Sequence, residues 1–105
     1  MKRGEIWLVD LPSSDGHEQT GMRPVIILVE TEVNIAIIIP LTSTIQALRF
    51  PHTFEIKPSE LNGLTYISVA LIFQIRAIDK ARLKKKIGSV EISILRELDL
   101  MLKKC

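Results

Sequence analysis

The sequence contains little cysteine and little histidine, which excludes several common kinds of active site. Its one cysteine, Cys105, is the last of 105 residues, so an internal disulfide cannot form and a zinc site built from cysteines lacks ligands. Because that cysteine is terminal, neither His17 nor His52 has a cysteine partner, and no glycine-rich phosphate loop occurs. An enzyme with this composition must work through arginine, hydroxyl and carboxylate groups. We therefore expect no metal site and no cofactor.

The chain also lacks the apolar segments that direct proteins into or across membranes. Its N-terminal residues before position 5 have neither the apolar core nor the cleavage site of a signal peptide. The strongest apolar run, residues 35–39, is far too short to span a bilayer. Together with the lack of disulfides, these features predict a soluble, cytoplasmic protein without a membrane partner.

No charge of one sign dominates the chain, whose formal net charge is only +2. The length suffices for one core, and we expect a single domain over residues 1–105. The positive charge is nevertheless concentrated in one short stretch, formed by Lys80, Arg82, Lys84, Lys85 and Lys86. Such a cluster can bind phosphate groups, although a solvated helix face or turn is the commoner explanation.

Apolar and β-branched segments in the first half of the chain predict strands. Residues 5–11 have the composition of a first strand. Residues 24–30 and 34–41 are continuous β-branched runs, and the connection between them is short enough for a hairpin. Unbroken apolar strands are typical of sheets covered on both faces, as in a sandwich or a small closed barrel. Pro40 cannot donate to a ladder, so we expect it at a strand end or a sheet edge.

The second half of the chain predicts shorter strands and one helix. Residues 52–56, 66–72 and 73–78 are strand candidates, and the last two could form one bent strand. Asp79 can cap a short helical turn after them. Apolar residues then recur at the spacing of one helix face: Ile94, Leu95, Leu98, Met101 and Leu102. This pattern predicts a C-terminal helix with Ser89 as its N-cap, packed on a small curved sheet or barrel, so that the fold is mainly β.

Three places have polar residues next to apolar strands, where binding groups are expected. Arg23 directly precedes an apolar run, so its charge needs either a carboxylate partner such as Glu18 or a phosphate, whose oxygens fit the guanidinium fork. Thr42 follows the next run, where its hydroxyl can bond the turn backbone or donate to a phosphate oxygen. Gln74 and Arg76 alternate along a predicted strand and share one face, which is either an exposed sheet face or the floor of a nucleic-acid groove.

These residues lie in three longer motifs. The first is RGEIWLVDL at residues 3–11 with GHEQTGMRPV at residues 16–25, the second is PLTS at residues 40–43, and the third is FQIRAIDKARL at residues 73–83. In this order and over this length, the motifs resemble the MazF/PemK-type toxins of type II toxin–antitoxin systems. The resemblance extends from residue 3 to near the C-terminus.

The resemblance implies a small SH3-like or CcdB-like β-barrel that works as a homodimer. It also implies a sequence-specific, metal-independent endoribonuclease, with Arg23 and Thr42 as its catalytic residues and residues 12–22 as a loop over the RNA. The 2′-hydroxyl of single-stranded RNA would attack the phosphate, which leaves a 2′,3′-cyclic phosphate and a 5′-hydroxyl end. Further candidates for RNA contacts are Glu18, Gln19, Gln74 and Arg76.

The partners that the resemblance implies are single-stranded RNA and a cognate antitoxin with an acidic C-terminal tail. The chain would associate with DNA only indirectly, through the antitoxin. Two other functions remain open. One is a non-enzymatic toxin that resembles CcdB and binds DNA gyrase, for which the residues near the C-terminus would matter most. The other is a plain small-barrel binding module without toxicity. The motifs around Arg23 and Thr42 favour the endoribonuclease.

Overall fold

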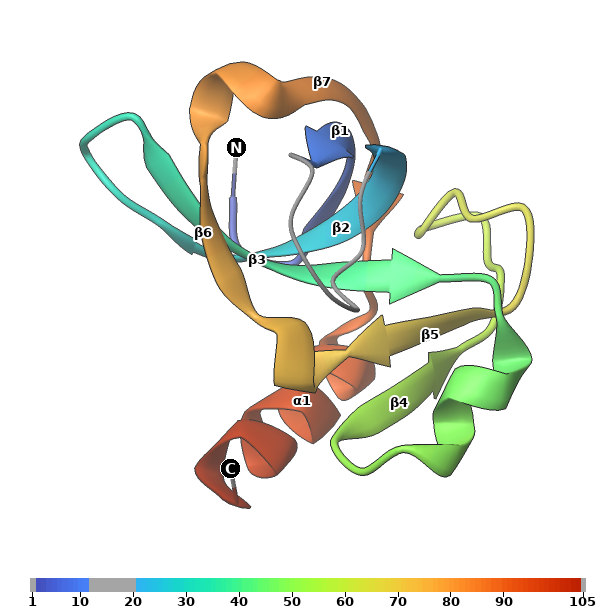
Figure 1. Ribbon diagram of the computed structural model, residues 1–105. Helices are drawn as coiled ribbons and strands as arrows, with labels where there is room; N and C mark the ends of the chain where they lie inside the picture. Colours follow the sequence, from blue (N-terminus) through green and yellow to red (C-terminus); the bar gives the residue numbers. More distant parts are fainter. Residues whose placement is uncertain (1, 12–20, 105) are drawn as a thin grey trace.

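The long apolar segments form the centre of an antiparallel sheet (Figure 1). β1 (Glu5–Leu11), β2 (Gly21–Glu30) and β3 (Ile35–Thr42) lie side by side in that order, and β2 and β3 form the predicted hairpin. This computed structural model describes residues 2–11 and 21–104. Of the predicted loop over residues 12–22, only the last two residues are described, and they already belong to β2.

Shorter strands extend this centre on both sides: β4 (Thr53–Ile56), β5 (Ser68–Leu71), β6 (Arg76–Asp79) and β7 (Leu83–Ser89). The spatial order is β4-β5-β3-β2-β1-β7, and β6 pairs with β3 outside this path. The connections contain short 3₁₀ helices, η1 (Ile45–Arg49), η2 (Ile72–Gln74) and η3 (Lys80–Arg82). The prediction of a mainly β fold is therefore confirmed, with an open, barrel-like sheet in place of a closed barrel.

Strand β3 changes its partner along its length. Its first half, up to Ile38, pairs with β6, whereas Leu41 and Thr42 pair with β5. Pro40 lies between the segment of β3 that pairs with β6 and the segment that pairs with β5. On this edge of β3 none of the described strands pairs with it, so its missing N–H removes no ladder hydrogen bond there. The expectation that Pro40 would lie at a strand end or a sheet edge is wrong, because this change of partner in a central strand also accommodates proline.

The sheet has an apolar cluster on each face, as the unbroken apolar strands predicted. One cluster includes Ile26, Ile39 and Leu41 and is covered by α1 (Ile92–Lys104), whose Leu98 is fully buried in it. Figure 1 shows α1 lying against this side of the sheet, beneath β5. The second cluster, on the other face, includes Val25 and Ile38. In residues 2–11 and 21–104, no helix is long and apolar enough to cross a membrane.

The predicted start of the helix is wrong because of pairing between distant segments, and the structure decides between the two alternatives for residues 66–78. Ser89 is the last residue of β7 and pairs with Glu5, so the helix begins only at Ile92. Residues 66–78 do not form one bent strand, because η2 separates β5 from β6. The predicted turn after β6 is confirmed as η3, where the Asp79 carboxylate accepts a hydrogen bond from the backbone of Ala81 at 2.9 Å.

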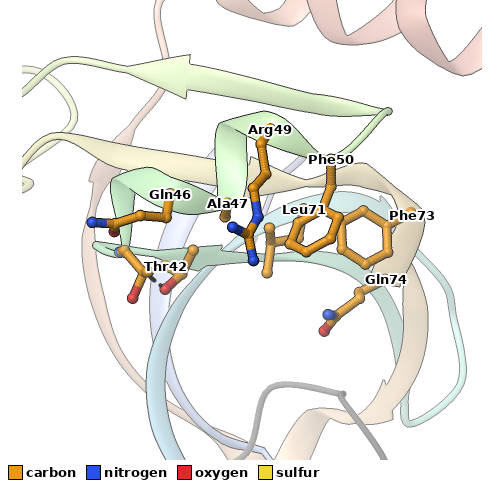
Figure 2. Close-up of a pocket in the computed structure, with 9 residues that line it drawn as sticks. Thr42, Gln46, Ala47, Arg49, Phe50, Leu71, Phe73 and Gln74 are labelled. Atoms are coloured by element: carbon orange, nitrogen blue, oxygen red, sulfur yellow. Dashed lines mark hydrogen bonds between the residues drawn. The ribbon is translucent and has the colours of Figure 1, made fainter.

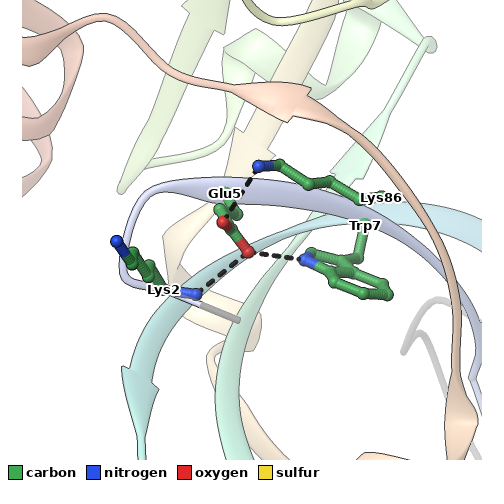
Figure 3. A network of polar contacts seen from close by, with 4 residues as sticks. All are labelled: Lys2, Glu5, Trp7 and Lys86. Atoms are coloured by element: carbon green, nitrogen blue, oxygen red, sulfur yellow. Dashed lines mark hydrogen bonds and ion pairs between the residues drawn. The ribbon is translucent and has the colours of Figure 1, made fainter.

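The start of β1 is held to β7 by contacts of Glu5, which is almost fully buried (Figure 3). Its Oε1 accepts hydrogen bonds from the backbone N–H of Lys2 at 2.9 Å and from the indole Nε1 of Trp7 at 3.0 Å. Its Oε2 forms an ion pair with Lys86 of β7 at 3.0 Å. A buried carboxylate is tolerated when it is paired and hydrogen-bonded, so this network stabilises the junction of the first and last strands.

Candidate functional site

Arg23 and Thr42 lie on neighbouring strands, each two residues beyond the last pair of the β2–β3 ladder, Val25 with Pro40. Residues two apart on a strand share a face, so Arg23 lies on the face of Val25 and Thr42 on the face of Pro40. Both residues line one hollow with a volume of about 220 Å³, which we call the arginine hollow. The structure thus brings together two residues that the sequence places in separate motifs.

The location of Arg23 follows from strand periodicity. Val25 and Ile27 alternate with Ile26 and point into the second apolar cluster, so Arg23 belongs to the same face of β2. At this end of the strand the apolar cover ends, and the Arg23 side chain is half-buried at the wall of the hollow. In this environment the methylene chain of the arginine is partly removed from water, while the N–H groups of its rigid guanidinium remain available as hydrogen-bond donors.

Thr42 contributes a hydroxyl group whose orientation is restricted. The residue is only 5% exposed, and its Oγ1 accepts a hydrogen bond from the backbone N–H of Thr44 at 3.2 Å. A threonine hydroxyl has one proton to donate in addition to its two acceptor positions. Because the backbone bond uses an acceptor position, the proton can be donated to a ligand in the hollow.

The opposite wall of the arginine hollow is built by a loop that Asn62 organises. The Asn62 side chain is fully buried, and its Nδ2 donates to the carbonyl of Lys57 at 2.8 Å. Its Oδ1 accepts from the backbone N–H groups of Ser59 and Leu64, both at 2.9 Å. This loop carries Tyr66 to the hollow. The Asn-Gly pair at residues 62–63, in a polar segment, is a signal for a turn, but nothing in the sequence marks the Asn62 side chain as the organiser of the loop.

Thr42 also lines a second hollow of about 510 Å³, which we call the aromatic hollow (Figure 2). Its walls come mainly from η1, η2 and the residues next to them, and they include Arg49, Phe50 and Phe73. No sequence pattern predicts this hollow, because Phe50 and Phe73 belong to different segments that only the fold brings together.

The other predicted site residues are placed as follows. Gln74 is the last residue of η2 and lines the aromatic hollow, whereas Arg76 begins β6 opposite Ile38 and is half-buried. The prediction that Gln74 and Arg76 share one strand face is wrong, because η2 interrupts the alternation. Glu18 and Gln19 lie outside the described residues, as does His17.

The basic cluster lies mostly on an edge of the sheet. Lys84, Lys85 and Lys86 are exposed on β7, the terminal strand of the sheet order. Charged lysines on an edge strand oppose pairing with another chain, so these residues are explained without a ligand. In the parts of the chain that the structure describes, no group of three or more histidine, cysteine or acidic side chains is arranged to hold a metal ion.

Comparison with known proteins relates the chain to one family. A family model described as PemK-like, MazF-like toxin of type II toxin–antitoxin system matches residues 2–105. The endoribonuclease MazF of Staphylococcus saprophyticus subsp. saprophyticus is 35% identical over 103 aligned residues, which cover 94% of this chain and 85% of that protein.

Solved structures share the fold at lower sequence identity. The crystal structure of MazF (Form-I) from Deinococcus radiodurans matches with a TM-score of 0.81 and 21% identity, covering 99% of this chain and 94% of that one. An endoribonuclease in complex with its cognate antitoxin, from a mycobacterial species, matches with a TM-score of 0.71 and 17% identity, covering 97% of this chain and 88% of that one.

Proposed function

Because the chain belongs to the PemK-like, MazF-like toxins of type II toxin–antitoxin systems, we propose that it is a sequence-specific endoribonuclease that cleaves single-stranded RNA. The observation that carries this proposal is the position of Arg23 and Thr42 in one hollow of about 220 Å³. The name of the relative from Staphylococcus saprophyticus, endoribonuclease MazF, supports the same activity.

The proposed reaction uses the nucleophile that RNA itself carries. The 2′-hydroxyl lies next to the scissile phosphate, so the enzyme has to align it, stabilise the charge that develops on the phosphoryl oxygens and transfer protons. In this attack the 2′-hydroxyl gives up its proton and its oxygen forms a bond to phosphorus. The bond from phosphorus to the 5′-oxygen of the next nucleotide breaks, and that oxygen takes up a proton. The products are a 2′,3′-cyclic phosphate and a 5′-hydroxyl end.

Arg23 and Thr42 supply donors for the phosphate in this proposal. A guanidinium stays protonated at ordinary pH, and its fork can donate two parallel hydrogen bonds to phosphate oxygens. We therefore assign transition-state stabilisation to Arg23. The Thr42 hydroxyl donates to a phosphate oxygen while its own oxygen is held by the backbone of Thr44. Since these donors act directly on the phosphate, we propose that cleavage does not depend on a metal ion.

Single substitutions test these assignments. Removing a directed donor from a site of this kind lowers kcat by roughly 10²- to 10³-fold, and we expect this loss for Arg23→Ala and for Thr42→Val. Thr42→Ser, which retains the hydroxyl, is the matched control and should keep most of the activity. The assay is cleavage of a long transcript in EDTA, with chemical analysis of the product ends and circular dichroism of each variant. Wild-type cleavage by a folded Arg23→Ala or Thr42→Val variant would contradict that residue's role.

We further propose that residues 1–105 form one toxin domain, that two copies form a homodimer and that a cognate antitoxin binds this chain. The match of the family model over residues 2–105 supports the first point, and the mycobacterial endoribonuclease solved with its antitoxin supports the last. An acidic, extended antitoxin tail would be attracted to the cationic groups of the site and would compete with RNA. Light scattering of the purified chain, and inhibition of cleavage by the protein encoded in the neighbouring gene, test these points.

A further inference from the structure

The aromatic hollow is a built feature with chemistry of its own. The Phe50 and Phe73 side chains at its wall are each 48% exposed, although large aromatic groups bury most of their surface in a core. Their ring centroids lie 6.2 Å apart, and the ring planes are inclined by 56°. Figure 2 shows the two rings side by side, next to Leu71. The hollow therefore presents exposed π surface, and the proposed catalytic residue Thr42 belongs to the same lining.

The inclined rings suit a flat guest. A flat aromatic group can stack against one ring while its edge meets the face or edge of the other, which is the preferred geometry for aromatic contacts. Arg49 adds positive charge at the same place, with its guanidinium carbon 5.2 Å from the centroid of Phe50. An aromatic platform joined to a cation is the combination with which proteins hold single-stranded nucleic acid.

Amide groups complete the wall of the hollow. Gln46 lies near Thr42 at one side and Gln74 lies beyond Phe73 at the other, as Figure 2 shows. A glutamine amide carries both donors and an acceptor, and it can form paired hydrogen bonds with the edge of a nucleobase. The hollow thus combines stacking surface with groups that can distinguish base edges.

We propose that the aromatic hollow takes up one nucleobase of the RNA, from a nucleotide next to the scissile phosphate, by stacking on Phe50 and Phe73. This inference rests on the proposed function and adds a specificity pocket to it. The hollow adjoins the proposed phosphate site, since Thr42 lines both. Bases of single-stranded RNA can leave the stack and expose their edges, which allows such a pocket to read one position. The pocket would therefore select the cleavage site while the chemistry takes place in the arginine hollow.

An abasic scan coupled to substitutions tests the pocket. Cleavage sites of the wild type are first mapped on a long transcript, and a short RNA containing one site is made with an abasic nucleotide at each position in turn. The variant is Phe50→Leu/Phe73→Leu, which keeps apolar bulk at two half-exposed positions and removes the aromatic faces. Val33→Ala, which shortens an exposed apolar side chain at the β2–β3 turn, is the control and should behave as the wild type.

The expected result is coupling between one base and the two rings. Stacking of a base on an aromatic side chain corresponds to roughly a tenfold to hundredfold effect. At one position next to the cleaved bond, the abasic change should lower kcat/KM of the wild type by this factor. The same change should alter the double variant by less than about threefold, because the variant has already lost the stacking partner.

Other results would overturn the inference in distinguishable ways. If the double variant loses as much activity as the wild type at every abasic position, the hollow holds no base although the enzyme cleaves RNA. If the variant cleaves intact RNA normally but binds the antitoxin more weakly, the hollow holds a protein side chain. If the wild type cleaves no transcript, the proposed function itself fails, and the base pocket fails with it.

Discussion

Glu5 should make the stability of this protein depend on pH in the acid range. Burial alone would raise the pKa of Glu5, but hydrogen bonds from Trp7 and from the backbone of Lys2, together with the charge of Lys86, lower this pKa from 4.5 to about 2. A difference of this size corresponds to about 3 kcal/mol of unfolding free energy. Because the folded-state pKa is the lower one, this contribution is complete above about pH 5 and is lost as the pH falls from about 4.5 to 2.

The Glu5→Gln variant isolates this effect. Glutamine keeps an acceptor oxygen for Trp7 but has no charge, so the variant resembles wild type with Glu5 protonated. We expect the variant to be less stable by about 3 kcal/mol at pH 7, by about 2 kcal/mol at pH 3.5, and by less than about 1 kcal/mol at pH 2. The assay is urea unfolding at fixed protein concentration, followed by fluorescence of Trp7, the one tryptophan of the chain and a direct partner of Glu5.

Two controls separate the buried hydrogen bonds from the exposed ion pair. Lys86→Gln should lower the unfolding free energy by less than about 1 kcal/mol, because the lysine side chain is 50% exposed and such pairs are weak. Glu32→Gln removes an exposed carboxylate at the β2–β3 turn and should change stability by no more than about 0.5 kcal/mol. A gap between wild type and Glu5→Gln that stays constant from pH 7 to pH 2 would refute the reasoning.

Two further predictions concern the wall of the arginine hollow. Asn62→Ala removes the side-chain hydrogen bonds to three backbone groups and should lower the unfolding free energy by about 3 kcal/mol. Urea unfolding measures this loss, and a value below about 1 kcal/mol would contradict the role of Asn62 in the loop. Gly63→Ala places a Cβ 2.4 Å from the carbonyl oxygen of Ile87 at a φ of +67°, whereas at Gly21, with a φ of +80°, a Cβ meets nothing within 4 Å. Gly21→Ala should therefore destabilise the protein by about 1 kcal/mol, which lowers the melting temperature by a few degrees. Gly63→Ala should lower the melting temperature by clearly more. Equal shifts for the two variants would show that the loop moves to accommodate the added Cβ.

Local sequence signals were sufficient where a strand or turn is determined by its own residues. The bounds of β1 were predicted correctly, and Asp79 caps a turn as expected. β2 begins at Gly21, three residues before the predicted start, because Gly21 and Met22 pair with the end of β1. Pairing with a distant strand also places Ser89 in β7. Such pairings depend on tertiary register, which local periodicity does not reveal.

The candidate site was predictable in part for the same reason. Arg23 and Thr42 each stand out at the end of an apolar run, and the β2–β3 hairpin then brings both to one hollow. The aromatic hollow has no comparable signal, since Phe50 and Phe73 become neighbours only through the packing of η1 against β5 and of η2 against β3 and β4. Roles of Glu18 and Gln19 stay predictions.

The pairing of β1 with β7 has a consequence for synthesis of the chain on the ribosome. β1 is among the first residues to emerge, but its second partner strand, which ends at Ser89, is among the last. Ile87 of β7 also lines the arginine hollow, so a nascent chain without β7 lacks part of that wall. Long-range strand pairing forms late because its loop-closure entropy must be overcome first. We therefore expect ribosome-bound chains that end before residue 83 to be inactive on RNA, so that a cell would be exposed to this activity only after β7 has been translated.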